Sequence, residues 1–447
     1  MAVQPEIAAS IPDVNLREIY RIHLPRGLSG AAICVLLLCL FVCTTPSAQA
    51  QQYQVLHAFM ATEDGAVPYD TPTLDKGGNL YGTTYGYIKG YNSGVVWKVA
   101  FHATGWTFSP LFEFPGGYAS HLYGGVTFGP DGALYGATEG SFGKGVVYRL
   151  APAPSFCRSV SCFWLYGGIY QYAGSGDGVY MEGDLVFDAA GNMYGTSSGG
   201  GQYSGGTVFK LSPTGGGWTK TVIHDFGNGN DGSGPWSGLV FDKAGNLYGT
   251  TTEGGFSGCK SPYGCGTVYR LTPSGDSWTE SVIYYFHGQS DGSAIYAPPI
   301  IDDAGNLYGS ASDQGPNGGG TVFELSPSAG GWTFNLLYAF DYSEDELWPG
   351  PRGKLVMDPA GTLYGVTSLD GGRNTGTIFK LVPSGGGYAY STLYTFCSQP
   401  SCTDGWGPLS GLARDADGNL YGTTVGGGDT GPACGNEGCG VVFKFTP

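Results

Sequence analysis

Five Asp-Gly pairs are the residues of this sequence whose type and spacing could do chemistry. They recur along the chain in one kind of loop, as Asp64-Gly65, Asp177-Gly178, Asp231-Gly232, Asp291-Gly292 and Asp404-Gly405. Carboxylates that a repeating fold gathers on one face could bind calcium, a cationic ligand or a polysaccharide. Calcium takes about six to eight oxygen ligands, which a single Asp-Gly pair rarely supplies. The alternative, which we favour, is that each aspartate caps its own backbone in a tight turn.

Three tryptophans, Trp236, Trp348 and Trp406, occur in the same kind of loop as the Asp-Gly pairs. Exposed aromatic rings beside carboxylates would suit contact with carbohydrate. The alternative is that the rings are buried and anchor their loops, and this is the interpretation that we favour. The five aspartates and three tryptophans are our candidates for a ligand-binding face, on which calcium is one candidate ligand.

The sequence predicts no catalytic residue. It has no G-x-S-x-G, H-E-x-x-H, P-loop or dinucleotide-binding motif in the strand context that such motifs need. His57 and His224 occupy a position that is tyrosine in other repeats, and no two histidines lie close together in the sequence. A second acidic series, which a tight turn explains, consists of Asp75, Asp188, Asp242, Asp302, Asp358 and Asp415.

Eight cysteines outside the N-terminal segment fall into four close pairs: Cys157/Cys162, Cys259/Cys265, Cys397/Cys402 and Cys434/Cys439. An even number of locally paired cysteines in an exported protein predicts disulfides. Metal binding is the alternative, but zinc sites bring two such pairs together, and these pairs lie in different repeats. We therefore expect disulfides that fix surface loops.

The elements that must position these residues form a tandem repeat, marked by the motif Asn-Leu-Tyr-Gly-Thr. Seven tyrosines mark its copies at spacings of 54 to 60 residues: Tyr81, Tyr135, Tyr194, Tyr248, Tyr308, Tyr364 and Tyr421. A period of this size is typical of repeat architectures. Residues 238–286 contain four runs of β-branched and aromatic residues separated by turn residues, which predicts four antiparallel strands. Such a unit is a propeller blade.

The two ends of the sequence predict how the ring of blades closes. The seventh repeat stops at Pro447, where a third strand ends, and so lacks a fourth strand. Residues 53–59 match the fourth strands of other repeats, such as residues 282–286. Because an open ring would leave unpaired strand edges, we predict an all-β fold over residues 51–447. It is a single seven-bladed β-propeller whose last blade is completed by the N-terminal strand.

Composition and charge narrow the class of protein. Glycine accounts for 81 of 447 residues and charged residues for only 13 %, as expected for short strands and tight turns. The net charge of −16 and the lack of any Lys/Arg cluster argue against a nucleic-acid partner. We expect a monomer.

Residues 1–50 have the pattern of a cleaved secretory signal peptide. Arg17, Arg21 and Arg26 precede an apolar run at residues 31–43, and Ala48-Gln49-Ala50 follows. The apolar run is shorter than the roughly 18 residues that a membrane span needs. We therefore expect a mature chain that begins at Gln51, has no membrane span, and is secreted or periplasmic.

The pattern Gly-Leu-Val-x-Asp-x-x-Gly-Asn-Leu-Tyr-Gly-Thr-Thr, followed by Gly-Thr-Val-Phe-Lys-Leu-x-Pro, resembles the GloVer repeat of exported bacterial proteins. These proteins are also described as "choice-of-anchor" proteins. The resemblance covers residues 51–447 and implies a cell-surface or secreted protein of unassigned activity. No segment beyond Pro447 could be a C-terminal sorting helix, which favours free secretion over tethering. The repeat is also similar to those of NHL and streptogramin-lyase propellers, a similarity of fold only.

Two hypotheses of function follow. The first is a non-catalytic extracellular binding or scaffold protein whose ligand, a polysaccharide or a protein, binds the acidic loops. The second is a propeller hydrolase or lyase that acts on a polysaccharide or lactone with a metal in the central channel. They differ in whether carboxylates and a histidine converge at the channel mouth, and the lack of a histidine at that position favours the first.

Overall fold

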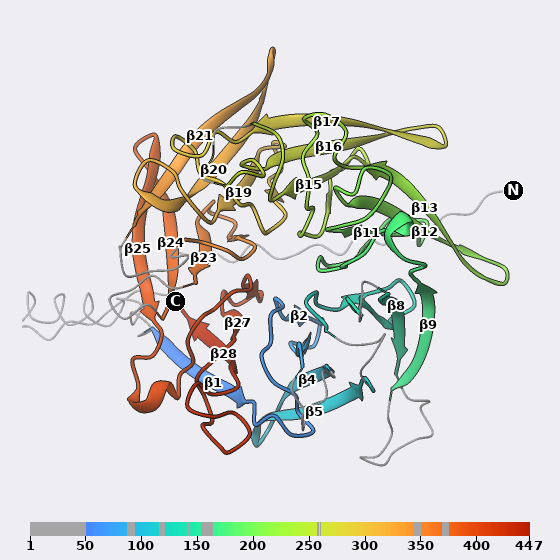
Figure 1. The fold of residues 1–447 in the computed structure, drawn as a ribbon. Helices are drawn as coiled ribbons and strands as arrows, with labels where there is room; N and C mark the ends of the chain where they lie inside the picture. Colours follow the sequence, from blue (N-terminus) through green and yellow to red (C-terminus); the bar gives the residue numbers. More distant parts are fainter. Residues whose placement is uncertain are drawn as a thin grey trace, which may run out of the picture. The chain divides into compact units, whose positions relative to one another are not determined.

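The structure is a computed structural model that describes residues 51–86, 94–115, 121–140, 144–152, 164–256, 259, 261–342, 350–368 and 375–447. Seven four-stranded antiparallel sheets follow one another around a ring (Figure 1). This confirms the predicted seven-bladed β-propeller. None of the described helical segments could cross a membrane. Residues 1–50 lie outside the described residues, so the signal peptide stays a prediction.

Each blade is one sheet, and its strands pair in chain order. Blade 1 contains β2 (Thr73–Leu74), β3 (Leu80–Thr83), β4 (Val95–His102) and β5 (Gly105–Glu113). Blade 2 contains β6 (Thr127–Phe128), β7 (Leu134–Ala137), β8 (Val146–Ala151) and β9 (Leu165–Gln171). Blade 3 contains β10 (Val186–Phe187), β11 (Met193–Ser197), β12 (Thr207–Thr214) and β13 (Gly217–Asp225). Blade 4 contains β14 (Val240–Phe241), β15 (Leu247–Thr251), β16 (Thr267–Ser274) and β17 (Ser277–Tyr285).

The remaining blades follow the same plan. Blade 5 contains β18 (Ile300–Ile301), β19 (Leu307–Ala311), β20 (Gly318–Ser328) and β21 (Gly331–Asp341). Blade 6 contains β22 (Val356–Met357), β23 (Leu363–Thr367), β24 (Thr377–Ser384) and β25 (Gly387–Thr395). Blade 7 contains β26 (Ala413–Arg414), β27 (Leu420–Thr424) and β28 (Val441–Thr446), and its fourth strand is β1 (Gln52–Ala58).

The N-terminal strand closes the ring, as the sequence predicts. β1 pairs antiparallel with β28, from Gln52 opposite Thr446 to Ala58 opposite Val441. The Tyr53 ring stacks on Tyr394 of blade 6 with ring centroids 4.1 Å apart. The first and last described strands therefore belong to one sheet.

The glycine of the Tyr-Gly-Thr motif makes room for the core of its own blade. A Cβ atom on Gly249 would lie 2.3 Å from the hydroxyl of Tyr269 on the neighbouring strand, and one on Gly309 would lie 2.5 Å from the Phe323 ring. Both aromatic rings are fully buried. The recurrence of this glycine therefore follows from packing.

Six of the seven marker tyrosines are buried and Tyr364 is half-buried, and these rings pack between blades. The ring of Tyr194 meets Phe241 and Trp278 of the next blade at centroid distances of 5.3 and 5.7 Å. Its hydroxyl donates to Asp188 Oδ2 (3.0 Å), and this carboxylate also accepts the backbone N–H of Asn192 (2.8 Å). The second acidic series thus forms tight turns and anchors the tyrosines.

Hydroxyl groups on the second strands connect neighbouring blades near the axis. The first threonine or serine after Tyr-Gly donates to a backbone carbonyl of the next blade. The described bonds of this kind are Thr83 to Gly124 (3.1 Å), Thr196 to Ser237 (2.7 Å), Thr250 to Ala297 (3.2 Å), Ser310 to Gly353 (3.4 Å) and Thr423 to Asp70 (2.9 Å). These hydrogen bonds fix the backbone just before each innermost strand.

Candidate functional site

The segments that lead into the innermost strands enclose a cavity on the axis of the ring. The cavity has a volume of about 150 Å³ and is lined by every blade. We call the lining residues the axial segments: 69–71, 123–124, 182–184, 236–238, 296–298, 352–354 and 409–411. They confirm that the Gly-Leu-Val strands are those nearest the axis.

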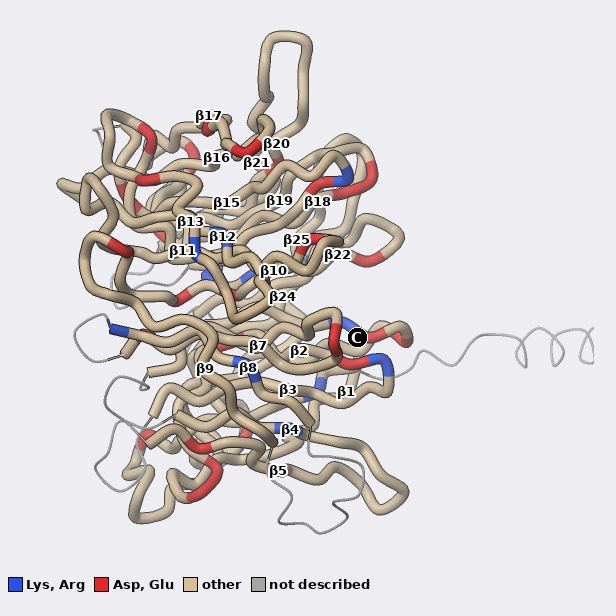
Figure 2. The backbone as a smooth tube through the Cα atoms, turned by 90° about the vertical axis from the view of Figure 1, so that its right-hand side faces the viewer, with Lys and Arg blue, Asp and Glu red and all other residues tan. Residues whose placement is uncertain are grey.

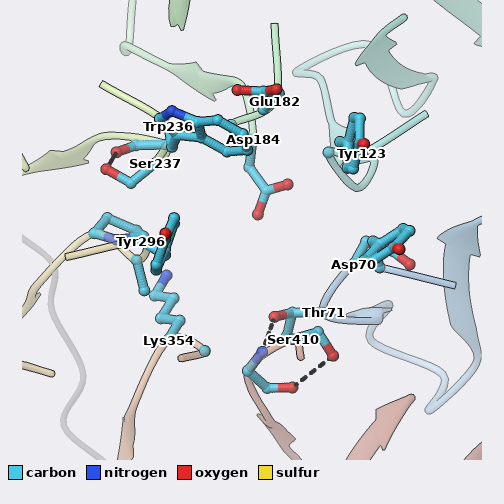
Figure 3. Close-up of a pocket in the computed structure, with 18 of the residues that line it drawn as sticks. Asp70, Thr71, Tyr123, Glu182, Asp184, Trp236, Ser237, Tyr296, Lys354 and Ser410 are labelled. Carbon is cyan, nitrogen blue, oxygen red and sulfur yellow. Dashed lines mark hydrogen bonds between the residues drawn. The ribbon is translucent and has the colours of Figure 1, made fainter. Parts of the chain in front are cut away.

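Aromatic side chains dominate the first position of the axial segments. That position holds Tyr69, Tyr123, Glu182, Trp236, Tyr296, Arg352 and Leu409. Tyr69 and Tyr123 form one aromatic pair, with centroids 5.2 Å apart, and Trp236 and Tyr296 form another at 5.9 Å. Figure 3 shows the second pair and Tyr123 on different sides of the cavity. Trp236 is 37 % exposed, so part of its indole ring is accessible to a ligand.

Two carboxyl groups converge beneath the first position. Asp184 Oδ1 accepts the Gly125 N–H (2.7 Å), and Asp70 Oδ2 accepts the Thr83 N–H (3.1 Å). A Cβ atom on Gly125 would lie 3.1 Å from Asp70 Oδ2 and 3.2 Å from Asp184 Oδ1. A side chain at residue 125 would therefore require both carboxyl groups to shift by a few tenths of an ångström.

Burial keeps the acidic side of the cavity partly protonated. Burial raises the pKa of Asp70 well above its usual range, and the charge of Asp184 adds to this rise. Burial also raises the pKa of Asp184, although the Gly125 N–H and the charge of Lys354 oppose it. Burial raises the pKa of Glu182 to about 8. Asp70 Oδ1 and Glu182 Oε2 are buried and have no hydrogen-bond partner among the described residues.

Blade 6 supplies the basic side of the cavity. The Arg352 guanidinium lies over the Tyr296 ring, 4.2 Å from its centroid. The Lys354 side chain extends beside Tyr296 (Figure 3). Because seven blades follow one another around the ring, blade 6 lies across the axis from blades 2 and 3. The cavity therefore has a basic side opposite an acidic side.

The five predicted aspartates lie outside this cavity and cap their own loops. Asp291 accepts the His287 N–H (2.9 Å), and its other oxygen contacts His287 Nδ1 (3.0 Å) and the Tyr284 hydroxyl (2.7 Å). In the other four loops the aspartate likewise contacts one backbone N–H of the loop and one side chain of the fourth strand. The N–H groups belong to Met60 for Asp64, Ala173 for Asp177, Gly227 for Asp231 and Ser398 for Asp404. The side chains are, in the same order, His57, Tyr170, His224 and Tyr394. This geometry matches the turn-capping interpretation. Figure 2 shows acidic residues gathered in loops, where these five lie.

Only one of the three predicted tryptophans is found to line the axial cavity. Trp236 does so, whereas Trp406 Nε1 donates to the Glu437 carbonyl (2.9 Å) and its ring lies against Gly426. Trp406 therefore anchors a loop. Trp348 lies outside the described residues.

Three of the four predicted disulfides are present in the described part of the chain. Cys259–Cys265, Cys397–Cys402 and Cys434–Cys439 are bonded, with Cα atoms 5.5, 4.1 and 5.1 Å apart. Cys157 and Cys162 lie outside the described residues, so their pairing stays a prediction. Cys439 packs in the core beside Phe59, which immediately follows the ring-closing strand.

Asp291→Asn is expected to destabilise the propeller by about 1–3 kcal/mol, because an amide group would face the buried donors of its loop. Asp429→Asn is the matched control, since Asp429 is exposed and accepts the Gly431 N–H (2.8 Å) in its turn. Among the described residues, no three His, Cys, Asp or Glu side chains are grouped as metal ligands. We therefore expect the same loss of stability in EDTA and in millimolar calcium, measured by denaturant unfolding. Calcium that stabilises the wild type but not the variant would show instead that this loop binds the ion.

The sequence also contained a signal for the axial residues. Around them the repeats keep their residue types, as in Leu185-Val186-Phe187 and Leu239-Val240-Phe241. The axial positions themselves differ from blade to blade, as in Glu182-Gly183-Asp184 and Trp236-Ser237-Gly238. At positions that vary within an otherwise repetitive chain, the packing of the blades does not require a particular residue type.

The fold and the axial cavity define a repeat-built propeller with one asymmetric site. The chain belongs to the Gloeobacter/Verrucomicrobia repeat family, which it matches over residues 165–349 and 259–447. No curated protein matches the chain.

Three solved structures are similar to the chain at low sequence identity. The extracellular domain of BT4673 from B. thetaiotaomicron, described as a putative one component system, has 11 % identity and a TM-score of 0.52. The match covers 88 % of this chain but only 39 % of that chain. An oxidoreductase of Thermus thermophilus, described as a glucose dehydrogenase, has 14 % identity and a TM-score of 0.43, covering 89 % of this chain and 100 % of the other. A luciferin-regenerating enzyme has 14 % identity and a TM-score of 0.40, covering 89 % and 96 %. At these identities the likeness concerns the fold alone.

Proposed function

We propose that the protein is an exported, non-catalytic binding protein that holds the end of a saccharide chain in its axial cavity. One observation carries the proposal. Every blade contributes a different set of side chains to a single cavity, and four of the seven first positions are aromatic. Because the packing of equivalent blades does not require different side chains at these positions, we attribute the differences to the binding of a ligand.

The lining of the cavity suits one sugar ring. The exposed part of the Trp236 indole ring can stack on the apolar face of a sugar ring. Glu182 and Asp184 line the cavity and are half-buried, so their carboxyl groups can bond to sugar hydroxyl groups.

Export is supported by the three described disulfides, because disulfides persist in oxidising compartments. The predicted signal peptide agrees with this location. Mass spectrometry of the protein recovered from the periplasm or medium should give Gln51 as the first residue. Recovery of the uncleaved chain from the cytosol would contradict export.

The binding proposal is tested by screening the mature protein against an array of oligosaccharides. Trp236→Ala should weaken binding of any captured saccharide at least about tenfold, since central aromatic residues carry a large share of binding energy. Tyr263→Ala is the matched control, because Tyr263 is 68 % exposed and lies outside the cavity. Equal binding by both variants would place the saccharide elsewhere.

The alternative, a hydrolase or lyase, rests on Glu182. A buried carboxyl group with a pKa of about 8 could act as a general acid. Product analysis of the captured saccharides after incubation distinguishes the two functions. Chain cleavage that Glu182→Gln abolishes, while binding persists, would identify an enzyme and overturn the non-catalytic proposal.

A further inference from the structure

The two cations of the axial cavity have no anionic partner in the described part of the chain. Arg352 and Lys354 both line the cavity, and neither forms an ion pair or a hydrogen bond with any residue that the structure describes. Arg352 is held in place by its contact with the Tyr296 ring, 4.2 Å away. Lys354 is exposed and Arg352 is half-buried, so both cations are accessible to an anionic group of a ligand.

The acidic side of the cavity does not neutralise these cations. Lys354 influences Asp184 electrostatically, but these two described groups form no ion pair. Glu182, with a pKa of about 8, is mostly protonated at neutral pH and can donate a hydrogen bond. The cavity therefore offers positive charge on blade 6 and, on blade 3, a Glu182 carboxyl group that is mostly protonated.

We infer that the axial ligand is a sugar ring that bears a carboxylate, the terminal uronic acid residue of an acidic polysaccharide. Its carboxylate binds Arg352 and Lys354, its ring stacks on Trp236, and its hydroxyl groups reach Asp184 and Glu182. A guanidinium group whose plane is held over an aromatic ring is well suited to bind a planar carboxylate. This inference rests on the proposed function, since it specifies the ligand of the same cavity.

The experiment compares matched sugars that differ only in the carboxylate. Isothermal titration measures binding of the methyl glycosides of glucuronate, galacturonate and mannuronate, and of glucose, galactose and mannose, to the mature protein. At least one uronate should bind ten or more times more tightly than its neutral partner. This preference should decrease as salt increases, because the ion pairs are screened.

Substitutions of the two cations of blade 6 test whether they cause the preference for uronates over neutral sugars. Lys354→Met and Arg352→Gln should each reduce the ratio of uronate to neutral-sugar affinity at least about fivefold, since each removes one charge-assisted hydrogen bond. Lys243→Met is the matched control and should leave the ratio unchanged, because Lys243 is 84 % exposed and pairs with Asp303 outside the cavity.

The outcomes separate the inference from the proposed function. Neutral sugars that bind as tightly as uronates, with binding still lost in Trp236→Ala, would overturn the inference and leave the saccharide site intact. A uronate preference that survives in both blade 6 variants would overturn the assignment to Arg352 and Lys354. Binding of neither kind of sugar, alone or as the end of an oligosaccharide, would overturn both.

Discussion

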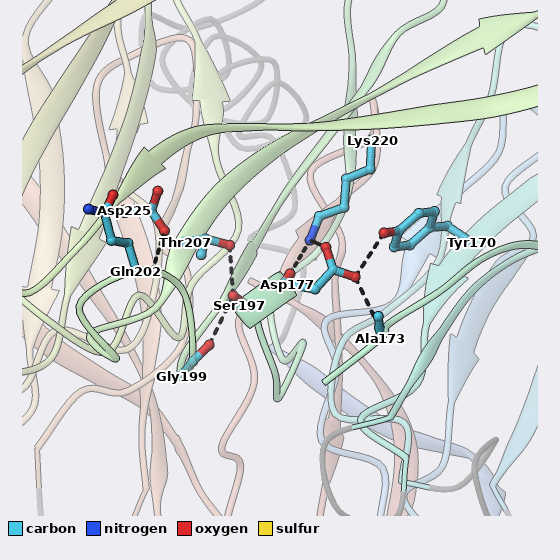
Figure 4. Close-up of polar contacts among 9 residues, drawn as sticks. All are labelled: Tyr170, Ala173, Asp177, Ser197, Gly199, Gln202, Thr207, Lys220 and Asp225. Carbon is cyan, nitrogen blue, oxygen red and sulfur yellow. Dashed lines mark hydrogen bonds and ion pairs between the residues drawn. The ribbon is translucent and has the colours of Figure 1, made fainter. Parts of the chain in front are cut away.

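Replacing Lys220 with alanine is expected to lower the free energy of unfolding by about 3–5 kcal/mol, the usual cost of removing one partner of a buried ion pair. The Lys220 side chain is only 3 % exposed, and its ammonium group lies 2.9 Å from Asp177 Oδ1 (Figure 4). It also donates to the Asp177 carbonyl and lies over the Tyr172 ring, 4.3 Å from the centroid. Removing it leaves the Asp177 carboxylate without its charged partner between two blades.

The position of Lys220 explains why the effect should be large. At equivalent positions in other blades an aromatic ring stacks on the preceding blade, as Tyr390 does on Tyr338 (4.3 Å) and Phe334 on Tyr284 (4.8 Å). Lys220 replaces such a stack with an ion pair and a cation–π contact at the junction of blades 2 and 3. Replacing Lys220 therefore removes contacts that hold blades 2 and 3 together.

The chain contains a matched control for Lys220. Lys243 and Asp303 also form an ion pair, at 2.7 Å, but their side chains are 84 % and 97 % exposed. Lys243→Ala should therefore leave the free energy of unfolding almost unchanged. Guanidinium-induced unfolding of both variants tests the difference. Similar losses from the two substitutions would show that Lys220 contributes no more than a surface ion pair.

Removal of residues 51–59 is expected to have the largest effect on the propeller. The loss of a buried aromatic residue such as Phe59 costs about 3–5 kcal/mol when it is reduced to alanine, and here the whole strand, with the half-buried Tyr53, is absent. The edge of β28, with its buried Phe443 and Phe445, becomes open to pairing with other chains. We expect the shortened chain to be strongly destabilised and to aggregate.

A peptide supplied in trans tests whether ring closure is the cause. A synthetic peptide of residues 51–60 should bind the shortened chain and restore its melting midpoint and its resistance to protease. A peptide with Tyr53→Ala should restore less, because it loses the 4.1 Å stack on Tyr394 and the hydrogen bond to the Asp404 carbonyl. A shortened chain that melts like the full one would show that β1 does not hold the ring together.

The sequence predicted the scaffold well because the scaffold is what repeats. The tyrosine and glycine of the Tyr-Gly-Thr motif recur since every blade needs the same contacts, namely Tyr194 against Phe241 and room for Tyr269 beside Gly249. The unmatched third strand at the end of the chain was enough to predict the pairing of β1 with β28.

The candidate site was harder to predict for the same reason. The Asp-Gly pairs attracted attention by recurring, and the structure shows their carboxyl groups bonded within their own loops, as in Asp291 with His287. His287, which is isolated in the sequence, acquires this partner through the turn of the chain. Glu182, Asp184 and Arg352 occur once each at their positions, and only the closed ring brings them to one cavity.

The hydroxyl groups that connect neighbouring blades have a consequence for how such proteins can diversify. Thr196 and Thr250 bind the backbone carbonyls of Ser237 and Ala297, not their side chains. The side chain at the first position of an axial segment, such as Trp236 or Tyr296, takes no part in these bonds. A single substitution in one blade can therefore alter what the cavity recognises while the fold stays the same, so that new specificities can evolve one blade at a time.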